Sequence, residues 1–195
     1  MTEWRIESLG PGHNRSDFSC GISSLDDFIR LRATQYQRRR LGKTIVAVTR
    51  GQERVGGYYT IAASALAFAS LPPGLGRKLP RHPVPSLLIA RLAVAQTHQG
   101  QRLGETLLLD ALQRAAGLSD QMGIHLVEVD AVDDRAAAFY RKYGFTPLDD
   151  QPHRLLLPID TILSAGPSAE ESLRDSGGVA MSASVIADSD PTDAP

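Results

Sequence analysis

The segment HQGQRLGETLLLDALQRA, His98 to Ala115, decides the fold of this chain. It places two glycines, Gly100 and Gly104, in a short polar loop directly before a strongly amphipathic helix. Such a loop presents backbone N–H groups at a helix N-terminus, where partial positive charge attracts anions. The spacing is not a dinucleotide fingerprint, because no third glycine follows, and it is not a Walker A loop, because G-K-[ST] is absent. The loop is therefore either a plain tight turn or the site of some other anion.

The elements around this loop form a strand, glycine loop, helix and strand crossover. Apolar residues alternate through SLLIARLAV, which is typical of a strand. Four of them are predicted to share one face: Leu88, Ala90, Leu92 and Val94. A helix is predicted over 104–123 and the next strand over 124–132. This order predicts an α/β (α+β) fold in which helices flank a mixed central sheet.

Glycine and proline mark the limits of the remaining elements. Ser23 and Ser24 precede an apolar periodicity and predict a helix that Gly42 ends. Gly51 predicts the turn of an antiparallel hairpin, and the five prolines of residues 71–86 predict a loop. The other predicted elements are strands over 43–50, 54–68 and 153–159 and a helix over 133–145 that ends at Gly144.

The composition predicts one folded domain followed by a tail of different character. A chain of 195 residues with 42% hydrophobic residues can bury one core. Residues 164–195 carry six acidic residues against Arg174 alone and lack aromatic residues, so we expect a disordered acidic tail. The folded domain is then expected to cover residues 1–163. Because the net charge of the whole chain is −1 and that of the tail is −5, residues 1–163 carry +4.

The single cysteine and the hydropathy limit where the chain can work. Cys20 can form neither an internal disulfide nor a thiolate-rich metal site, and we predict no metal. It is expected to pack or to serve loop chemistry, with reactivity as the alternative. No apolar run is long enough to span a bilayer, and MTEWRIESLG lacks the apolar region of a signal peptide. These features predict a cytoplasmic protein that has no membrane partner.

Two segments together resemble a known family. LAVAQTHQGQRLGETLL is similar to motif A of the GNAT acetyltransferases, Q/R-x-x-G-x-G/A, and DRAAAFYRKYGF is similar to their downstream A-x-x-F-Y-x-x-x-G-F segment. The resemblance implies a GNAT fold, whose sheet is splayed where acetyl-CoA binds, with the pyrophosphate on N–H groups of residues 101–106. The cofactor-binding residues that it implies are Leu92, Ala93, Val94, Gln99, Gly100, Gln101, Arg102, Leu103, Gly104, Glu105, Thr106, Asp133 and Phe139.

Two residues depart from the family pattern. Arg102 stands at the position of the middle glycine, which is tolerable if Arg102 is helical, and its charge would help to hold phosphate. Asp133 stands where many members have an asparagine that contacts the pantetheine arm or its surroundings. This second departure affects one contact and leaves the expected fold unchanged.

A narrower resemblance covers nearly all of residues 1–163. FSCGISSLDDFI, GYYTIAASAL, LPRHPVPSLLIARLAV and FYRKYGFTPL follow the order found in the GNAT toxins of bacterial toxin–antitoxin operons. This resemblance implies a toxin that acetylates the amino group of aminoacyl-tRNA. It also implies a ribbon-helix-helix antitoxin, a homodimer, and contact with operator DNA only through the antitoxin complex.

Basic residues gather in two segments of the sequence, and RNA phosphates would fit them. Such clusters supply the nonspecific, salt-sensitive part of RNA affinity. The alternative for the run Arg38 to Arg40 is an ordinary solvated helix face. Arg91 falls outside the apolar alternation of its strand and either aids the tRNA end or pairs with a carboxylate. The predicted tRNA-binding residues are Arg38, Arg39, Arg40, Lys43, Arg77, Lys78, Arg81 and Arg91.

The reaction needs a neutral amine and a donor that protonates the departing CoA thiolate. Tyr140 is the predicted catalytic residue, because the resemblance places its hydroxyl beside the CoA sulfur, and a positioned acid contributes about 10²–10⁴ in rate. The alternatives are that Tyr140 packs in the core or that Tyr143 takes the role. An α-amino group titrates near ~8 against ~10.4 for lysine, so an aminoacyl ester needs little help from a base. Glu128 and Asp130 share a strand face and could act through water on a lysine or polyamine.

Three functions remain open at this stage. The first is a toxin that acetylates charged tRNA and so blocks translation. The second is a housekeeping GNAT that acetylates a small amine or a protein N-terminus. The third is a mainly regulatory protein that binds DNA with its partner and keeps only a remnant of the cofactor site. A neighbouring gene for a small ribbon-helix-helix protein favours the first or third, and toxicity on induction separates these two.

Overall fold

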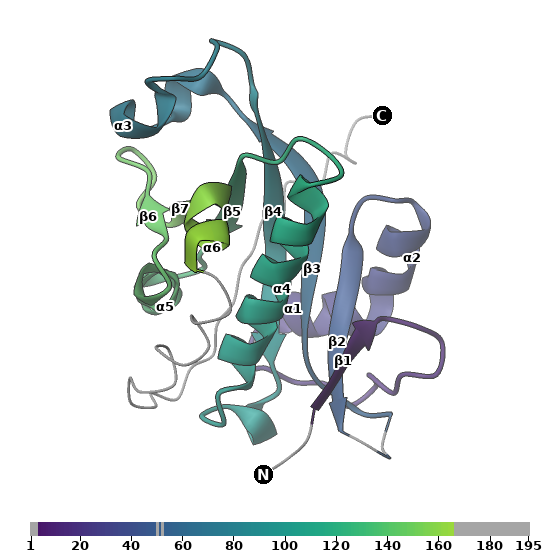
Figure 1. Ribbon diagram of the computed structural model, residues 1–195. Helices are drawn as coiled ribbons and strands as arrows, with labels where there is room; N and C mark the ends of the chain where they lie inside the picture. The colour runs from purple at the N-terminus through teal and green to yellow at the C-terminus, as the bar shows by residue number, and fades with distance from the viewer. Residues whose placement is uncertain (1–3, 50, 52, 166–195) are drawn as a thin grey trace, which may run out of the picture.

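Seven strands form one sheet in the order β1-β2-β3-β4-β5-β7-β6 in the computed structural model, which describes residues 4–49, 51 and 53–165 (Figure 1). Neighbouring strands are antiparallel except β4 and β5, which are parallel. The strands are β1 (Trp4–Ser8), β2 (Lys43–Thr49), β3 (Val55–Leu66), β4 (Val84–Val94), β5 (Leu126–Asp130), β6 (Thr146–Pro147) and β7 (Arg154–Pro158). The mixed α+β fold predicted from the sequence is confirmed.

Helices cover both faces of this sheet. α4 (Leu103–Ser119) lies across one face, and a helical segment made of α1 (Ser23–Asp27), a π-helical turn (Phe28–Arg32) and α2 (Ala33–Arg38) lies on the opposite face (Figure 1). The remaining helices are α3 (Pro73–Gly76), α5 (Asp134–Lys142) and α6 (Ile159–Ala165). The helix predicted after Ser23 is therefore present, with a π-helical turn in its middle.

The core divides by sheet face because strand side chains alternate between the two sides. On the α4 face, Leu107, Leu108 and Ala111 pack against strand residues such as Ile89 and Val129. On the opposite face, two apolar clusters are separate. One lies under α1 and α2 and includes Phe28 and Tyr58, and the other lies under the segment 66–84 and includes Leu66, Val84, Leu126 and Leu156.

Several elements differ from the sequence prediction, among them the two-residue strand β6, which was not predicted. β1 was not predicted, because its residues Trp4–Ser8 mix charged and apolar side chains and remain half-buried at the sheet edge. α6 was not predicted either; it follows β7 directly, and the predicted domain end near 163 lies inside it. The proline-rich loop 71–86 contains α3, with Pro73 at its first position, and its last residues already belong to β4. The disordered tail predicted beyond 163 falls almost wholly on residues 166–195, which lie outside the described residues.

A bulge in β4 overturns the predicted alternation of its side chains. Thr60 of β3 pairs with Arg91, but the next residue, Ile61, pairs with Ile89, so Ala90 is the extra residue of the bulge. Leu92 and Val94 do face α4 together, as predicted, whereas the residues on that face before the bulge are Leu87 and Ile89. Leu88 and Ala90 were therefore assigned to the wrong face, because a bulge shifts the period of two by one residue.

Candidate active site

The sheet opens between its two parallel strands. β4 and β5 pair from Ser86 and Leu126 up to Ile89 and Val129, and their pairing ends there although β4 continues to Val94. The last part of β4 keeps its antiparallel partner β3, because Arg91 to Val94 pair with Gly57 to Thr60. One edge of β4 is thus left outside the ladder with β5. An extended ligand with amide groups could hydrogen-bond to this edge as an added strand does.

The turn after β4 leads from this opening into the N-terminus of α4. A short 3-10 helix, Gln96–His98, precedes Gly100, which has a φ of 78° that favours glycine. The side-chain amide of Gln99 donates to the carbonyl oxygens of Val94 at 3.1 Å and Cys20 at 3.0 Å. The amide of Gln101 donates to the carbonyl of Thr97 at 3.1 Å. These bonds hold the turn in one conformation before any ligand arrives.

Arg102 is not helical, contrary to the condition set from the sequence. It caps α4 with φ 62° and ψ 10°, a left-handed conformation that costs a non-glycine residue about 1–2 kcal/mol. Its guanidinium bonds to the carboxylate of Glu105 through Nε at 2.7 Å and Nη2 at 2.8 Å. The backbone at this position keeps the geometry that a glycine would adopt, and the side chain is directed into an ion pair within the first turn.

The other predicted cofactor residues of this region offer mainly backbone groups. Leu92, Ala93, Val94 and Leu103 are buried, so their side chains belong to the core. A Cβ on Gly104 would meet the Val94 side chain at 3.6 Å, an ordinary contact. The N–H groups at the start of α4 lack helical partners, as at every helix N-terminus, and form the electropositive end of the helix.

α5 supplies the aromatic part of the site. Asp133 caps this helix, and its carboxylate accepts a hydrogen bond from the N–H of Ala136 at 2.7 Å. The residue that departs from the family asparagine therefore has a capping role of its own. Phe139 is 4% exposed, and its ring packs edge-on against the rings of Tyr140 and Tyr143.

Tyr140 and Tyr143 differ sharply in their surroundings. Tyr140 is fully buried, and its hydroxyl has no hydrogen-bond partner among the described residues. Burial raises the pKa of this phenol well above its usual range. Tyr143 is half-buried, and burial together with the nearby Glu105 carboxylate raises the pKa of its phenol to about 12. A buried hydroxyl without a hydrogen-bond partner lowers the stability of the fold by about 1–3 kcal/mol, and a bound ligand could supply the missing partner.

The sheet face opposite α4 carries a polar strip between its two apolar clusters. Glu128 is fully buried; its carboxylate accepts hydrogen bonds from the Ser86 hydroxyl and, at 2.6 Å, from Nη2 of Arg154. Asp130 lies two residues further along β5 and keeps 27% of its side chain exposed. The sequence grouped the two carboxylates as possible bases. Glu128 is instead locked in a buried ion pair.

Arg91 belongs to the same polar strip. It is only 9% exposed, and its guanidinium lies 3.9 Å from the ring centre of Phe28 and 5.5 Å from that of Tyr36. This is a cation–π arrangement, which the sequence analysis did not anticipate. The π-helical turn brings the Phe28 ring over the strand, so the aromatic neighbours of Arg91 come from the helical segment.

The predicted tRNA-binding residues lie in two separate groups. Arg38, Arg39, Arg40 and Lys43 are exposed between the end of α2 and the start of β2. Arg77, Lys78 and Arg81 are exposed after α3. Figure 1 shows α2 and α3 apart from each other on the molecule, so the two groups do not form one patch.

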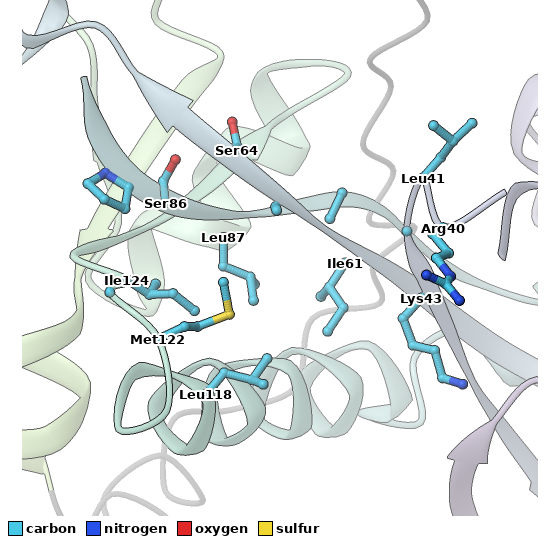
Figure 2. Close-up of a pocket in the computed structure, with 15 residues that line it drawn as sticks. Arg40, Leu41, Lys43, Ile61, Ser64, Ser86, Leu87, Leu118, Met122 and Ile124 are labelled. Atoms are coloured by element: carbon cyan, nitrogen blue, oxygen red, sulfur yellow. The ribbon is translucent and has the colours of Figure 1, made fainter.

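A groove that the sequence did not reveal lies near the first basic group. Its volume is about 290 Å³, and its lining is mostly apolar, with side chains from β3, β4 and the far end of α4 (Figure 2). Arg40 and Lys43 stand at one end of it, and Met122 and Ile124 at the other (Figure 2). Leu41 and Met122 are about half exposed there. The groove is at the end of α4 remote from the glycine turn.

Two further groups have local explanations. Cys20 is buried, and burial together with the Asp26 carboxylate raises the pKa of its thiol to about 12, which opposes the reactive alternative.

Glu7, His13 and Glu53 come close together near β1, where the guanidinium of Arg5 bonds to both carboxylates. Nδ1 of His13 accepts from the N–H of Gly10 at 2.9 Å, so Nε2 carries the proton that points to Glu7. This is the geometry of an ion-pair network.

Comparison with known proteins agrees with this geometry. The acetyltransferase (GNAT) domain model matches residues 57–147. Over 168 residues the chain is 35% identical to the probable toxin TacT of Sinorhizobium fredii, which covers 82% of this chain and 93% of that protein. Over 142 residues it is 37% identical to a tRNA-acetylating toxin of Mycobacterium tuberculosis, with 73% and 84% covered. The chain therefore belongs to the GNAT acetyltransferases.

Solved structures of toxins share the fold. AtaT complexed with acetyl-methionyl-tRNAfMet has a TM-score of 0.78 and 28% identity, with 83% of this chain and 98% of that chain covered. AtaTR bound with acetyl-CoA has a TM-score of 0.73 and 29% identity, with 83% and 96% covered. A tyrosine-to-phenylalanine variant of AtaT bound to the C-terminus of the antitoxin AtaR also has 0.73, with 26% identity and 84% and 98% covered. None of the helices in the described part of our chain is both long and apolar enough to cross a membrane.

Proposed function

We propose that this GNAT enzyme is a toxin that transfers the acetyl group of acetyl-CoA to the amino group of an aminoacyl-tRNA. The observation that carries the proposal is that β4 parts from β5 after Val129, which belongs to the same cluster as Tyr140, whose buried hydroxyl has no partner among the described residues. The similarity to a tRNA-acetylating toxin and to AtaT in complex with acetyl-methionyl-tRNAfMet supports the choice of substrate. An N-acetylated amino group cannot form the next peptide bond, so translation would stop.

The residues that would hold acetyl-CoA fit its chemistry. The amides of its pantetheine arm match the edge of β4 from Leu92 to Val94, apart from the Val94 carbonyl, which already accepts from Gln99. Its pyrophosphate matches the N–H groups from Gln101 to Glu105. The N–H of Thr106 donates to the carbonyl of Arg102 at 3.1 Å and is not available. Gln99 and Gly100 would set the shape of the turn, and Asp133 and Phe139 would line the opposite wall from α5. Bound acetyl-CoA would supply an activated thioester at the opening between the two strands.

Tyr140 would protonate the departing thiolate. Its hydroxyl lies in an apolar cluster and makes no hydrogen bond to any described residue that a CoA sulfur atom would have to displace. Tyr143 is a weaker candidate, because it is half-exposed and lies beside the Glu105 carboxylate of the glycine turn. A phenol that remains protonated at neutral pH is suited to donate its proton to a thiolate.

The acceptor amine would need little chemical activation. The α-amino group of an aminoacyl ester has a reference pKa near ~8, so about a tenth of it is neutral at pH 7. The basic groups Arg38 to Lys43 and Arg77 to Arg81 would bind tRNA phosphates at two separate places. Exposed arginines and lysines supply such contacts without reading base sequence.

A protein antitoxin would neutralise the enzyme, as the complex of AtaT with the C-terminus of AtaR supports. We further propose that this antitoxin is a ribbon-helix-helix protein, that operator DNA is bound only through the complex, and that the enzyme is a cytoplasmic homodimer without a metal ion. These points follow the resemblance of the whole chain to the toxin group.

A cell-free translation reaction tests the proposal. The protein should stop synthesis only when acetyl-CoA is present. Once the acetyl-CoA has been replaced by excess CoA, fresh charged tRNA should restore synthesis. Tyr140→Phe should stop synthesis far more slowly. Acetylation of small amines by a protein that leaves translation untouched would contradict the proposal and favour a housekeeping acetyltransferase.

A further inference from the structure

The two sides of the strand opening carry different chemistry. Tyr140 packs in the cluster on the α4 face of the sheet, together with Val127 and Val129 of β5. Because strand side chains alternate, Glu128 and Asp130 project from the opposite face. A thioester lying in the opening would have the proton donor on one side, so an incoming amine would approach from the other side. The acceptor would therefore meet the polar strip of that face.

This strip lies between two covered regions. α1, the π-helical turn and α2 cover one apolar cluster, and the segment 66–84 covers the other. Between them, Leu88 and Ser64 are half-buried, and the charged members of the strip are Arg91, Glu128, Asp130 and Arg154. The strip thus combines partial access with charged side chains at the point where β4 and β5 separate.

Only one of the two carboxylates in the strip is available to a ligand. Both oxygens of Glu128 have short partners, Ser86 and Arg154, and the residue is fully buried. Asp130 lies directly opposite Arg154 in the strand register, but its contact with Nε of Arg154 is long, at 3.8 Å. Asp130 therefore retains hydrogen-bonding capacity at the last position of β5, next to the opening. Burial raises the pKa of this carboxyl, as expected for a partly desolvated acid.

We infer that Asp130 binds the amino group of the acceptor and that Arg154 positions the Asp130 carboxylate. This inference rests on the proposed function, because the amine in question is the α-amino group of an aminoacyl-tRNA. Arg154 is anchored by Glu128 at 2.6 Å, and its buried Nε has no hydrogen bond within the described part of the chain. Its charge fixes where Asp130 lies without taking up both oxygens of that carboxylate.

The proton balance of the reaction agrees with this role. The acceptor ammonium gives one proton to Asp130 or through it to water, and the neutral nitrogen attacks the carbonyl carbon. The C–N bond forms and the C–S bond breaks. The nitrogen loses a second proton to solvent, the thiolate receives the proton of Tyr140, and the phenolate of Tyr140 then regains a proton from solvent. The products are an acetylated amine and a thiol, with one proton released overall.

A deaminated substrate isolates the contact. Chemical charging of the same tRNA with the matching α-hydroxy acid gives an α-hydroxyacyl-tRNA, which lacks the ammonium and leaves the rest of the RNA unchanged. Binding of both RNAs is measured with the full chain in the presence of CoA, which has no acetyl group to transfer. A charge-assisted hydrogen bond predicts that the wild type binds aminoacyl-tRNA about tenfold more tightly than hydroxyacyl-tRNA.

Asp130→Asn should abolish this preference and leave the affinity for hydroxyacyl-tRNA unchanged. Asp120→Asn, which makes the same charge change at the exposed end of α4, should keep it. A tenfold preference that survives Asp130→Asn, an equal loss of affinity for both RNAs, or a wild type without any preference would overturn the inference. If the proposed function itself were wrong, a different result would show it, because the wild type would then not acetylate charged tRNA at all.

Discussion

The glycine turn after β4 and the basic segment from Arg38 to Lys43 are both expected to bind phosphate, yet they are built in opposite ways. The turn offers backbone N–H groups held by buried neighbours and by the side-chain amide of Gln99. The basic segment offers exposed side chains on the surface. A site made of backbone N–H groups has one geometry and tolerates changes of side chain. A site made of charged side chains loses affinity for phosphate with each side chain that is removed, and its affinity depends on salt. Under the proposed function, the enzyme would hold a small cofactor by fixed backbone geometry and a large RNA by charge.

The largest effect is expected in the buried region, at the hydroxyl of Tyr140. Tyr140→Phe should lower turnover at least about tenfold, and up to about 10²–10⁴, because it removes the proton donor. Acetyl-CoA affinity should hardly change. Thermal stability should stay the same or rise, since the hydroxyl makes no hydrogen bond with the residues that the structure describes.

Steady-state kinetics and a melting curve on the same preparation provide the check. Tyr143→Phe is the matched control, and its turnover should remain within about threefold of the wild type. If Tyr143→Phe proved the slower enzyme, the roles of the two tyrosines would be reversed.

Glu128 should matter for stability through its buried ion pair. Glu128→Ala should lower the free energy of unfolding by about 2–3 kcal/mol, somewhat less than the ~3–5 of a fully buried pair, because 30% of the Arg154 side chain is exposed. Denaturant titration measures the change. Asp130→Asn is the comparison, and a loss as large as that of Glu128→Ala would show that Asp130 is also structural.

The basic segment should respond to salt where the glycine turn does not. Replacing Arg38, Arg39 and Arg40 by alanine should raise KM for charged tRNA and flatten its log–log salt dependence by about two to three, since fewer counterions are released. Acetyl-CoA binding should not change. Arg54→Ala, an exposed arginine at the hairpin between β2 and β3, serves as the control. An unchanged salt slope in the triple variant would make this segment an ordinary solvated face or a protein-docking surface.

The smallest effect is expected from the acidic C-terminal segment. Removal of residues 166–195 should leave the melting temperature within experimental error, because a segment of that composition has little apolar surface to bury. Differential scanning calorimetry of the full and shortened chains provides the comparison. A clear decrease would show that this segment contributes to the fold.

The same contrast explains how far the sequence alone could go. The glycine turn, α4 and the helix that carries Tyr140 follow from local patterns, because capping, periodicity and turn chemistry are encoded nearby. The left-handed Arg102 was not foreseen, because long-range packing around Gln99 fixes that turn more firmly than the residue's own preference.

Features that depend on strand pairing could not be predicted from local sequence patterns. The bulge at Ala90 exists only relative to β3, and it decided which face Leu88 occupies. The separate fates of Glu128 and Asp130 depend on Arg154, a residue of another strand. Arg91 packs against aromatic rings of a helical segment distant in sequence, whereas one alternative from the sequence was pairing with a carboxylate. Each of these outcomes requires the tertiary arrangement, which no local pattern in the chain contains.

Transfer of a labelled acetyl group to charged tRNA tests the proposed activity of the enzyme. The wild-type protein is incubated with acetyl-CoA labelled in its acetyl group and with total charged tRNA, in parallel with the same tRNA after deacylation. The proposed function predicts label in the charged RNA alone. Mild alkali should release this label as N-acetyl amino acid, because it hydrolyses the ester bond to the tRNA. Label that stays out of charged RNA, while small amines or protein N-termini become acetylated, would contradict it.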